Sequence, residues 1–393
     1  MGAGTTDDRE EVAALDWDEL DRRRIGIPWR LIGAVLGVLA VAAYALSGWS
    51  DPVYAWSPST LTWVYRASLV VLLAFGAPAL LANPGRTNRH LRRILRRPAG
   101  VVSLAITVSF VVLALLGPVV TGRPHTNVLA TYQPPVFGAV SKGTVAQNCV
   151  GSVTGPATTP VCHGSWQYPL GTTKVGQDMV TLLVSGLHVS FQVAVIAAVL
   201  MIPLATAVGV VAGYFGGTVD DVLMRYVDVQ QAVPAFVIYI VLLFVFGHSL
   251  LLLVAVFGLL NWGSIARLVR SETIQRRQEQ YVEVARSAGV GHGTIIRRHV
   301  IPNVSNSILV GTTQKIPQLV LIETALTFID LGDVGRWFQS FGDTIAAGFG
   351  SGQPAMVVWW IWVLPVAALG VVVLGLTVLG DVLRDVLDPR GAV

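Results

Sequence analysis

Charged residues are scarce in this sequence. Asp, Glu, Lys and Arg make up 13% of its 393 residues, and hydrophobic residues make up 53%. Soluble globular domains carry about 25% charged residues, because these side chains cover a surface that faces water. The shortage argues against a soluble protein and favours one whose surface faces lipid.

Signatures of nucleotide binding and catalysis are also missing. The chain has no Gly-x-x-x-x-Gly-Lys-Ser/Thr loop, so it does not itself cradle the phosphates of ATP. It has no His-Glu-x-x-His, no Gly-x-Ser-x-Gly and no paired-cysteine metal spacing. A membrane enzyme would need a convergent set of polar groups in its apolar segments, and none is evident. We therefore expect no catalytic residue, no metal site and no cofactor bound by this chain.

What the sequence does contain is a series of long apolar runs. A hydrocarbon core of about 30 Å is crossed by about 20 helical residues, and a span must be a helix to satisfy its own backbone groups. The runs are continuous and do not alternate with polar residues, which excludes a membrane β-barrel. We predict an all-α membrane protein, a polytopic helical bundle. Its eight expected spans, of which the fifth and sixth are short, are 31–48, 61–82, 100–120, 186–213, 232–247, 249–268, 304–329 and 357–379.

Basic residues are distributed unevenly between the loops that join these runs. When alternate loops are assigned to opposite sides, 20 of the 27 Lys and Arg residues fall on one side and four on the other. Cytoplasmic loops of membrane proteins carry the excess of basic residues. The asymmetry predicts a multi-pass protein of the cell (cytoplasmic) membrane with both termini in the cytoplasm. The net charge of +4 reflects the same bias, so the expected partner is the lipid bilayer and not nucleic acid.

Cysteine occurs only at Cys149 and Cys162, and both lie in the segment 121–185 that the topology places outside the cell. Two thiols in an oxidising compartment, with none elsewhere, predict a disulfide bond between them. Two free thiols remain the alternative, because the sequence gives no geometry. A zinc site is disfavoured, since these cysteines and His163 lack a fourth ligand.

Residues 281–303 form a polar stretch, rich in Arg and Gly, inside this apolar chain. Tyr281 to Ala288 is typical of a short helix, and Gly289 can close it in the left-handed conformation. Thr294 is expected to cap a second short helix, and Pro302 to end it. Two short helices at a membrane boundary suit a docking surface.

This stretch resembles the EAA loop of ABC-importer permeases, whose pattern is Glu-Ala-Ala, three residues, Gly, nine residues, Ile, one residue, Leu-Pro. The run Arg-His-Val-Ile-Pro-Asn at 298–303 is similar to the dipeptide/oligopeptide branch of that family. Glu283, Ala285, Gly289, Ile301 and Pro302 match the pattern, and Val284 and His299 depart from it.

The resemblance implies the transmembrane domain of a type I ABC importer. It further implies three kinds of partner: a second homologous permease subunit, two ATP-binding subunits that hold ATP and Mg, and an extracytoplasmic solute-binding protein. In that family the loop fits a groove on the ATPase. Within the loop we expect Tyr281, Val284 and Ala288 to form an apolar docking ridge. Ala285 and Gly289 would permit close approach of the partner. Glu283 and Arg286 would fix its orientation through polar contacts.

The resemblance covers the chain from about residue 86 to its end. Three further segments are similar to the family: 168–179, 212–217 and 379–390. The hairpin 31–82 is then an addition, and the resemblance says nothing about its purpose. The predicted organisation is a cytoplasmic tail 1–30, an extra transmembrane hairpin 31–82, a basic cytoplasmic linker 83–99, a first core helix 100–120, an external segment 121–185, and a permease core 186–393 with the coupling loop 281–303.

Glu323 lies inside the seventh predicted span. A carboxylate there costs a few kcal/mol unless it faces a partner or water. One interpretation is that Glu323 lines the translocation path, and the other is a buried structural role. Direct pairing with Lys315 is not expected, because eight residues of helix separate them by about 12 Å.

Two other groups of residues receive structural interpretations. The glycines Gly213, Gly216 and Gly217 predict a break at the end of the fourth span, and the charges of Asp221, Arg225 and Asp228 predict an internal ion-pair ladder after it. The tryptophans Trp359, Trp360 and Trp362 at the start of the last span predict an interfacial anchor.

A stand-alone secondary transporter or channel is the alternative function. It would need coupling carboxylates or broken helices in the middle of the membrane, and only Glu323 meets that description in the sequence. Co-purification of an ATPase would separate the two hypotheses. The sequence does not determine which solute is carried, whether a dipeptide, a longer peptide, a metal chelate or an oligosaccharide.

Overall fold

A computed structural model describes residues 29–46, 60–81, 84–145, 148–332 and 338–387. The predictions about the tail 1–28, the turn of the first hairpin and the end of the segment 379–390 lie outside these residues. The helices are α3 (Trp29–Leu46), α4 (Thr60–Leu81), α5 (Pro84–Leu95), α6 (Pro98–Thr121), α7 (Met179–Phe215), α8 (Gly217–Ala232), α9 (Ala235–Phe246), α10 (Leu250–Leu260), α11 (Gly263–Arg277), α12 (Gln280–Ser287), α13 (His292–Ile295), α14 (Ile301–Phe328), α15 (Phe341–Phe349) and α16 (Trp360–Leu387). The strands are β1 (Ala139–Ser141), β2 (Val153–Thr154) and β3 (Val161–His163).

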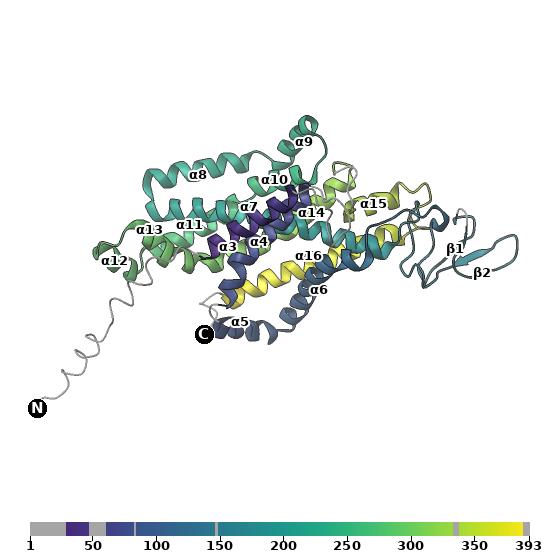
Figure 1. The fold of residues 1–393 in the computed structure, drawn as a ribbon, viewed down its shortest axis with the longest axis horizontal. Helices are drawn as coiled ribbons and strands as arrows, with labels where there is room; N and C mark the ends of the chain where they lie inside the picture. Colours follow the sequence, from purple (N-terminus) through teal and green to yellow (C-terminus); the bar gives the residue numbers. More distant parts are fainter. Residues whose placement is uncertain (1–28, 47–59, 82–83, 146–147, 333–337, 388–393) are drawn as a thin grey trace, which may run out of the picture.

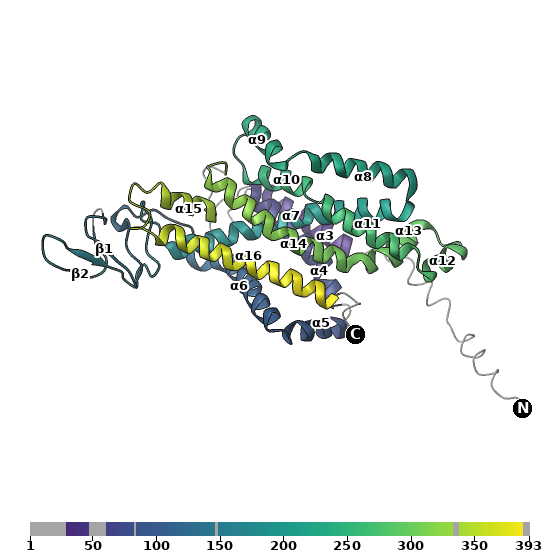
Figure 2. The same ribbon diagram turned by 180° about the vertical axis from the view of Figure 1, so that it is seen from behind.

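The described helices form an elongated bundle with two different ends (Figure 1). The short helices α12 and α13 lie at one end of the long axis, which we call the loop end, and the strands lie at the other, the sheet end. Helices α6 and α16 run side by side along one edge, and α8 lies outside α11 along the opposite edge (Figure 2). This arrangement confirms the predicted polytopic helical bundle.

Part of the predicted set of eight spans is recovered by length and apolar composition, and within the first hairpin the structure describes the shorter apolar runs Gly33–Ala42 and Thr60–Gly76. In the described part of the chain, four segments are long and apolar enough to cross a membrane, namely α6, α7, the run Leu250–Arg277 and α16. The pair α8 and α9, bent by 68°, makes a fifth if it is counted as one span. The predicted fifth span is too short alone, because the 12 residues of α9 extend only about 18 Å. Helix α14 has the length, with 28 residues, but a less apolar composition.

Close packing between α7 and α11 depends on two glycines of α7. A Cβ added at Gly209 would lie 2.6 Å from the carbonyl oxygen of Ala266, and one at Gly213 would lie 2.7 Å from that of Arg270. Small residues four apart allow helix backbones to approach in this way. Gly213 is therefore a packing residue and not a helix breaker, which corrects the prediction. The helix ends at Phe215, before Gly216 at φ +68°.

The small domain at the sheet end contains the disulfide. The strands pair antiparallel in the order β1-β3-β2, with Val140 opposite Cys162. Cys149 and Cys162 are bonded, with Cα atoms 5.7 Å apart, which confirms the predicted bridge. It closes a short loop onto β3, where Cys162 is fully buried.

The segment 168–179 joins this domain to the bundle. Asp178 caps α7 by accepting hydrogen bonds from the backbone N–H groups of Val180 and Thr181, each at 3.3 Å. The indole of Trp360 donates to the carbonyl oxygen of Thr172 at 3.0 Å. Because Trp360 is 1% exposed, it is a core residue and not the interfacial anchor predicted for it.

The first hairpin packs on the rest of the bundle through α4. Tyr65 is 5% exposed, and its ring makes edge contacts with His188 and Phe191 of α7, with centroids 5.8 and 6.2 Å apart. His188 Nδ1 in turn shares a hydrogen bond of 2.7 Å with the carbonyl oxygen of Ala114 on α6. The hairpin therefore covers a buried junction between α6 and α7.

Candidate functional site

The predicted docking helix is α12, and its C-terminal end has the expected glycine geometry. Gly289 has φ +75°, a conformation that costs other residues free energy. Its N–H donates to the carbonyl oxygen of Arg286, and the N–H of Val290 donates to that of Ala285. These two bonds form a Schellman motif, which fixes the angle at which the chain leaves α12.

The second half of the segment differs from the prediction. Gly291, and not Thr294, precedes α13, and Thr294 lies within that helix. A π-helical turn over Ile296–Val300 then connects α13 directly to α14. Pro302 sits in the first turn of α14, so it begins a helix where the sequence predicted an end. The wider π turn provides room for a proline ring that would clash with the carbonyl group four residues earlier in an α-helix.

The underside of this segment, which we call the coupling segment (residues 279–303), is anchored in the protein core. Val282, Ile295 and Val300 are fully buried in the largest apolar cluster, which extends through α7, α10, α11 and α14. Full burial of such a side chain stabilises the fold by about 1.5–3 kcal/mol. The coupling segment is therefore held firmly by the bundle.

The outer face of α12 presents most of the predicted docking residues. Tyr281 is 40% exposed and Val284 is 67% exposed, so a hydrophobic pair faces away from the bundle. Ala285 is partly buried, because it packs with Val290 against the apolar cluster that contains Val282. Four other predicted residues are exposed beside the pair: Glu283, Arg286, Ala288 and Gly289.

The two ends of the coupling segment contact each other through a ring pair. The rings of Tyr281 and His299 lie 5.9 Å apart. The side-chain amide of Asn303 donates both to the hydroxyl of Tyr281, at 3.2 Å, and to the carbonyl oxygen of His299, at 2.6 Å. The start of α12 is thus tied to the first turn of α14.

A contact with the end of α7 was not predicted. The hydroxyl of Tyr214 and Nδ1 of His292 share a hydrogen bond of 2.9 Å, and their rings lie 5.7 Å apart. The guanidinium group of Arg286 lies 5.8 Å from the centre of the Tyr214 ring. The sequence signal was the family-like run Ala-Gly-Tyr-Phe-Gly-Gly at 212–217, but no local pattern pairs it with His292. The coupling segment is therefore joined to the longest helix.

Arginines at the end of α11 complete the attachment. Arg277 donates to the backbone carbonyl oxygen of Tyr214 at 3.0 Å. Arg276 pairs with Glu272 at 2.9 Å and with Glu279, which precedes α12, at 3.7 Å. A displacement of α12 would consequently move α7, α11 and α14 together.

The predicted ion-pair ladder within α8 is replaced by pairs between helices. Asp220 forms a two-pronged ion pair with Arg270, and Asp228 pairs with Arg267 at 2.6 Å. In the described part of the chain, Asp221 and Arg225 form no ion pair with Asp228. Asp220 and Asp228 instead face α11, because α8 folds back along it. The C-terminal charges also pair at long range, since Asp385 contacts Arg97 at 2.7 Å.

Glu323, the predicted path-lining residue, is fully buried in α14. The hydroxyl of Thr327 donates to its backbone carbonyl oxygen at 3.0 Å, and that hydroxyl also accepts from Ser340 at 2.8 Å. Thr327, one turn after Glu323, thus contacts the start of α15, and Glu323 lies in the packed interior. A role in the path stays a prediction, and this position favours the structural interpretation.

Comparison with known proteins identifies two matching families. Residues 205–392 match the family described as binding-protein-dependent transport system inner membrane component. Residues 85–135 match the N-terminal transmembrane domain of oligopeptide transport permease C. The hairpin α3–α4 precedes both matched segments.

Individual relatives agree with these families. The oligopeptide transport system permease protein OppC of Haemophilus influenzae is 30% identical over 220 residues, which is 56% of this chain and 70% of the relative. OppC of Bacillus subtilis is 31% identical over 221 residues, covering 56% of this chain and 71% of that protein. OppC of Escherichia coli K12 is 32% identical over 220 residues, covering 56% and 72%.

Proposed function

Since this chain belongs to the family of inner-membrane components of binding-protein-dependent transport systems, we propose that it forms half of the translocation path of an ATP-driven peptide importer. It is a multi-pass protein of the cytoplasmic membrane, as the family and the spans agree. Peptides are the proposed solute because the relatives at 30–32% identity are oligopeptide permeases.

The coupling segment is the observation that carries this proposal. It exposes the hydrophobic pair Tyr281 and Val284, while its underside is buried in the bundle. A segment with only a structural role would have no need of an outward apolar face, whereas a docking surface requires one. Force applied to α12 reaches α7 through His292, α11 through Glu279 and α14 through Asn303.

The proposed partners dock at the two ends and along one side of the bundle. Two ATP-binding subunits, which hold ATP and Mg, bind the coupling segments of this chain and of a second homologous permease subunit. An extracytoplasmic solute-binding protein delivers peptide at the sheet end. This orientation, with both termini in the cytoplasm, is supported by the basic residues near the loop end and by a disulfide at the other end.

Transport then follows from a change in the packing of two subunits. Nucleotide-driven closure of the ATPases pulls the coupling segments together and shifts the population between inward-facing and outward-facing arrangements. This chain contributes a stiff lever, because the ion pair of Arg276 with Glu279 links the end of α11 to the start of α12. The Schellman motif at Gly289 fixes the angle at which the chain leaves α12.

A cysteine cross-link tests the docking surface. Because the two native cysteines are bonded to each other, Val284→Cys introduces a single free thiol. The matched control is Val245→Cys on α9, which is 68% exposed and lies away from the loop end. We expect a bifunctional thiol reagent to link Val284→Cys, and not Val245→Cys, to a co-purified ATPase. Purification of a chain that transports peptide without any ATPase would support the stand-alone transporter instead.

A further inference from the structure

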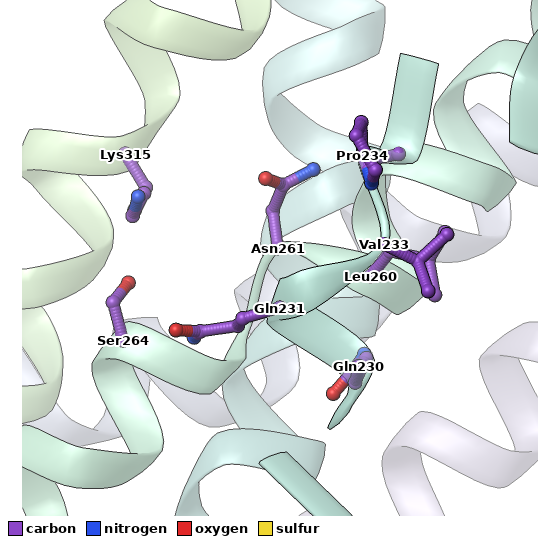
Figure 3. A pocket seen from close by; sticks show the side chains of 9 residues that line it. Gln230, Gln231, Val233, Pro234, Leu260, Asn261, Ser264 and Lys315 are labelled. Atoms are coloured by element: carbon purple, nitrogen blue, oxygen red, sulfur yellow. The ribbon is translucent and has the colours of Figure 1, made fainter. Parts of the chain in front are cut away.

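A cavity of about 320 Å³ opens where two spans of the chain are interrupted (Figure 3). One interruption is the 68° bend between α8 and α9, and the other is the break between α10 and α11. Lys315 of α14 forms the facing wall. Its volume is at the lower end of the range of about 300–1,000 Å³ for small-molecule sites.

The cavity lies near the middle of the helices that form it. Lys315 is close to the centre of the 28-residue helix α14, about 20 Å from either end. Asn261 lies at the break within the candidate span Leu250–Arg277, again far from both ends. The site is therefore separate from the coupling segment at the loop end and from the sheet end.

Lys315 carries a positive charge at this depth without a paired carboxylate. Its ammonium group donates to the side-chain oxygen of Gln318, one turn further along α14, at 3.2 Å. Among the described residues, no Asp or Glu forms an ion pair with Lys315. A charge within a span is costly unless it faces a partner or a water-filled path. Lys315 instead faces the cavity, which leaves its charge available to an anion.

The other polar groups of the cavity are neutral. The side chains of Gln231, Asn261 and Ser264 point into the same space as Lys315 (Figure 3). The amide nitrogen of Asn261 is already engaged, because it donates to the carbonyl oxygen of Phe257 at 2.9 Å. Within the part of the chain that the structure describes, none of the residues lining the cavity is acidic. These groups can donate and accept hydrogen bonds, but they do not neutralise the lysine.

Backbone dipoles add to the positive potential. Helices α9 and α11 both begin at the cavity, at Ala235 and Gly263. Neither first turn receives a hydrogen bond from a capping side chain. The N-terminus of a helix carries a partial positive charge and favours an anion. Two such ends and one ammonium group make the cavity complementary to a carboxylate.

We propose that this cavity is a solute-contact site of the translocation path and binds the terminal carboxylate of the transported peptide. Lys315 supplies the charge, and Gln231, Asn261 and Ser264 supply hydrogen bonds. This inference rests on the proposed import function, and it assigns a path-lining role to Lys315, where the sequence pointed only to Glu323. A site for passage needs weak contacts that release the solute, and a single, partly buried cation on one wall provides them.

Gly263 positions one of these groups. A Cβ at Gly263 would lie 2.2 Å from the side-chain nitrogen of Gln231. The glycine therefore allows Gln231 to lie across the start of α11. Gly263→Ala is expected to displace Gln231 and to lower peptide uptake by about threefold, as expected for a weakened hydrogen bond.

Uptake of two peptides that differ only in the terminal group tests the proposal. The probes are trialanine and trialanine amide, carried by the complete transporter with its co-purified subunits in proteoliposomes. For Lys315→Met we expect trialanine uptake to fall about tenfold and amide uptake to change less than twofold, because only the acid interacts with the charge. Lys315→Arg should retain uptake of the acid. Lys142→Met, which removes an exposed lysine of the external segment, is the matched control. Equal effects of Lys315→Met on both peptides would overturn the proposal.

A labelling experiment measures the cavity charge without any binding protein or ATPase. Ser264→Cys is labelled with methanethiosulfonate reagents that carry either a sulfonate or a trimethylammonium group. We expect Lys315→Met to lower the ratio of anionic to cationic labelling rates about tenfold. An unchanged ratio would show that Lys315 does not act on this cavity. Because this readout does not require transport, its failure is distinguishable from failure of the Val284→Cys cross-link, which would count against the import function itself.

Discussion

The hydroxyl of Tyr214 and Nδ1 of His292 share a hydrogen bond of 2.9 Å that joins the C-terminal end of α7 to the first residue of α13. The two residues are 78 positions apart in the sequence. Because Arg286 of α12 also lies over the Tyr214 ring, this tyrosine contacts both short helices of the coupling segment.

Tyr214→Phe removes the hydrogen bond and keeps the ring contacts. One hydrogen bond contributes about 1 kcal/mol, so we expect peptide uptake per ATP hydrolysed to fall by up to about fivefold. The measurement is the ratio of uptake to ATPase activity in proteoliposomes. The control is Tyr226→Phe on the exposed face of α8, whose hydroxyl bonds to none of the residues that the structure describes. Equal ratios of uptake to ATPase activity for the two variants would show that the Tyr214 hydroxyl does not contribute to coupling.

Gly289→Ala strains the Schellman motif. Nothing lies within 4 Å of the added Cβ, so the effect comes only from the positive φ of +75° and amounts to about 1–2 kcal/mol. We expect reduced ATPase-coupled uptake with a normal amount of inserted protein. The matched control is Gly352→Ala, because Gly352 has φ +78°, equally open surroundings and a position outside the coupling segment. If Gly352→Ala reduced uptake as much as Gly289→Ala, general destabilisation would explain both results.

Gly213→Ala tests the packing of α7 on α11. The new Cβ would lie 2.7 Å from both the Arg270 carbonyl oxygen and the Thr273 side chain. Overpacking of this kind costs about 1–3 kcal/mol, and we expect a lower midpoint of thermal unfolding in detergent. Gly370→Ala in α16, where the Cβ meets nothing within 4 Å, should keep or raise the midpoint. A Gly213→Ala protein as stable as the Gly370→Ala protein would contradict the close contact.

Reduction of the Cys149–Cys162 bond tests both the bridge and the orientation. A disulfide that closes a loop of about 15 residues stabilises a fold by about 3 kcal/mol, so its loss should increase proteolysis of the segment 121–178. A membrane-impermeant reductant followed by an impermeant maleimide should label these cysteines from the outside of sealed cells. Labelling only in inside-out vesicles would reverse the proposed topology.

Much of the architecture followed from local sequence patterns. Continuous apolar runs predicted α6, α7 and α16 because a helix in lipid must satisfy its own backbone groups. Gly289 predicted the end of α12, since a left-handed C-terminal residue is a local requirement. Pro302 was interpreted wrongly, because the sequence does not show the π turn that lets the proline start α14.

Other features depend on which helices become neighbours. Burial of Trp360 under Thr172, the ion pairs between α8 and α11, and the Tyr214–His292 contact join residues far apart in the chain. Periodicity along one helix carries no information about the residue that faces it.

The sequence by itself determined a helical membrane bundle and the short helix α12 with its glycine end, because each depends on composition or on residues close together in the chain. The tertiary structure alone decided that Glu323 is buried and that Lys315 faces a cavity. Both residues lie on α14, two turns apart, and the difference arises from what packs against each part of that helix. The packed interior covers Glu323, and the interrupted spans leave Lys315 facing a cavity.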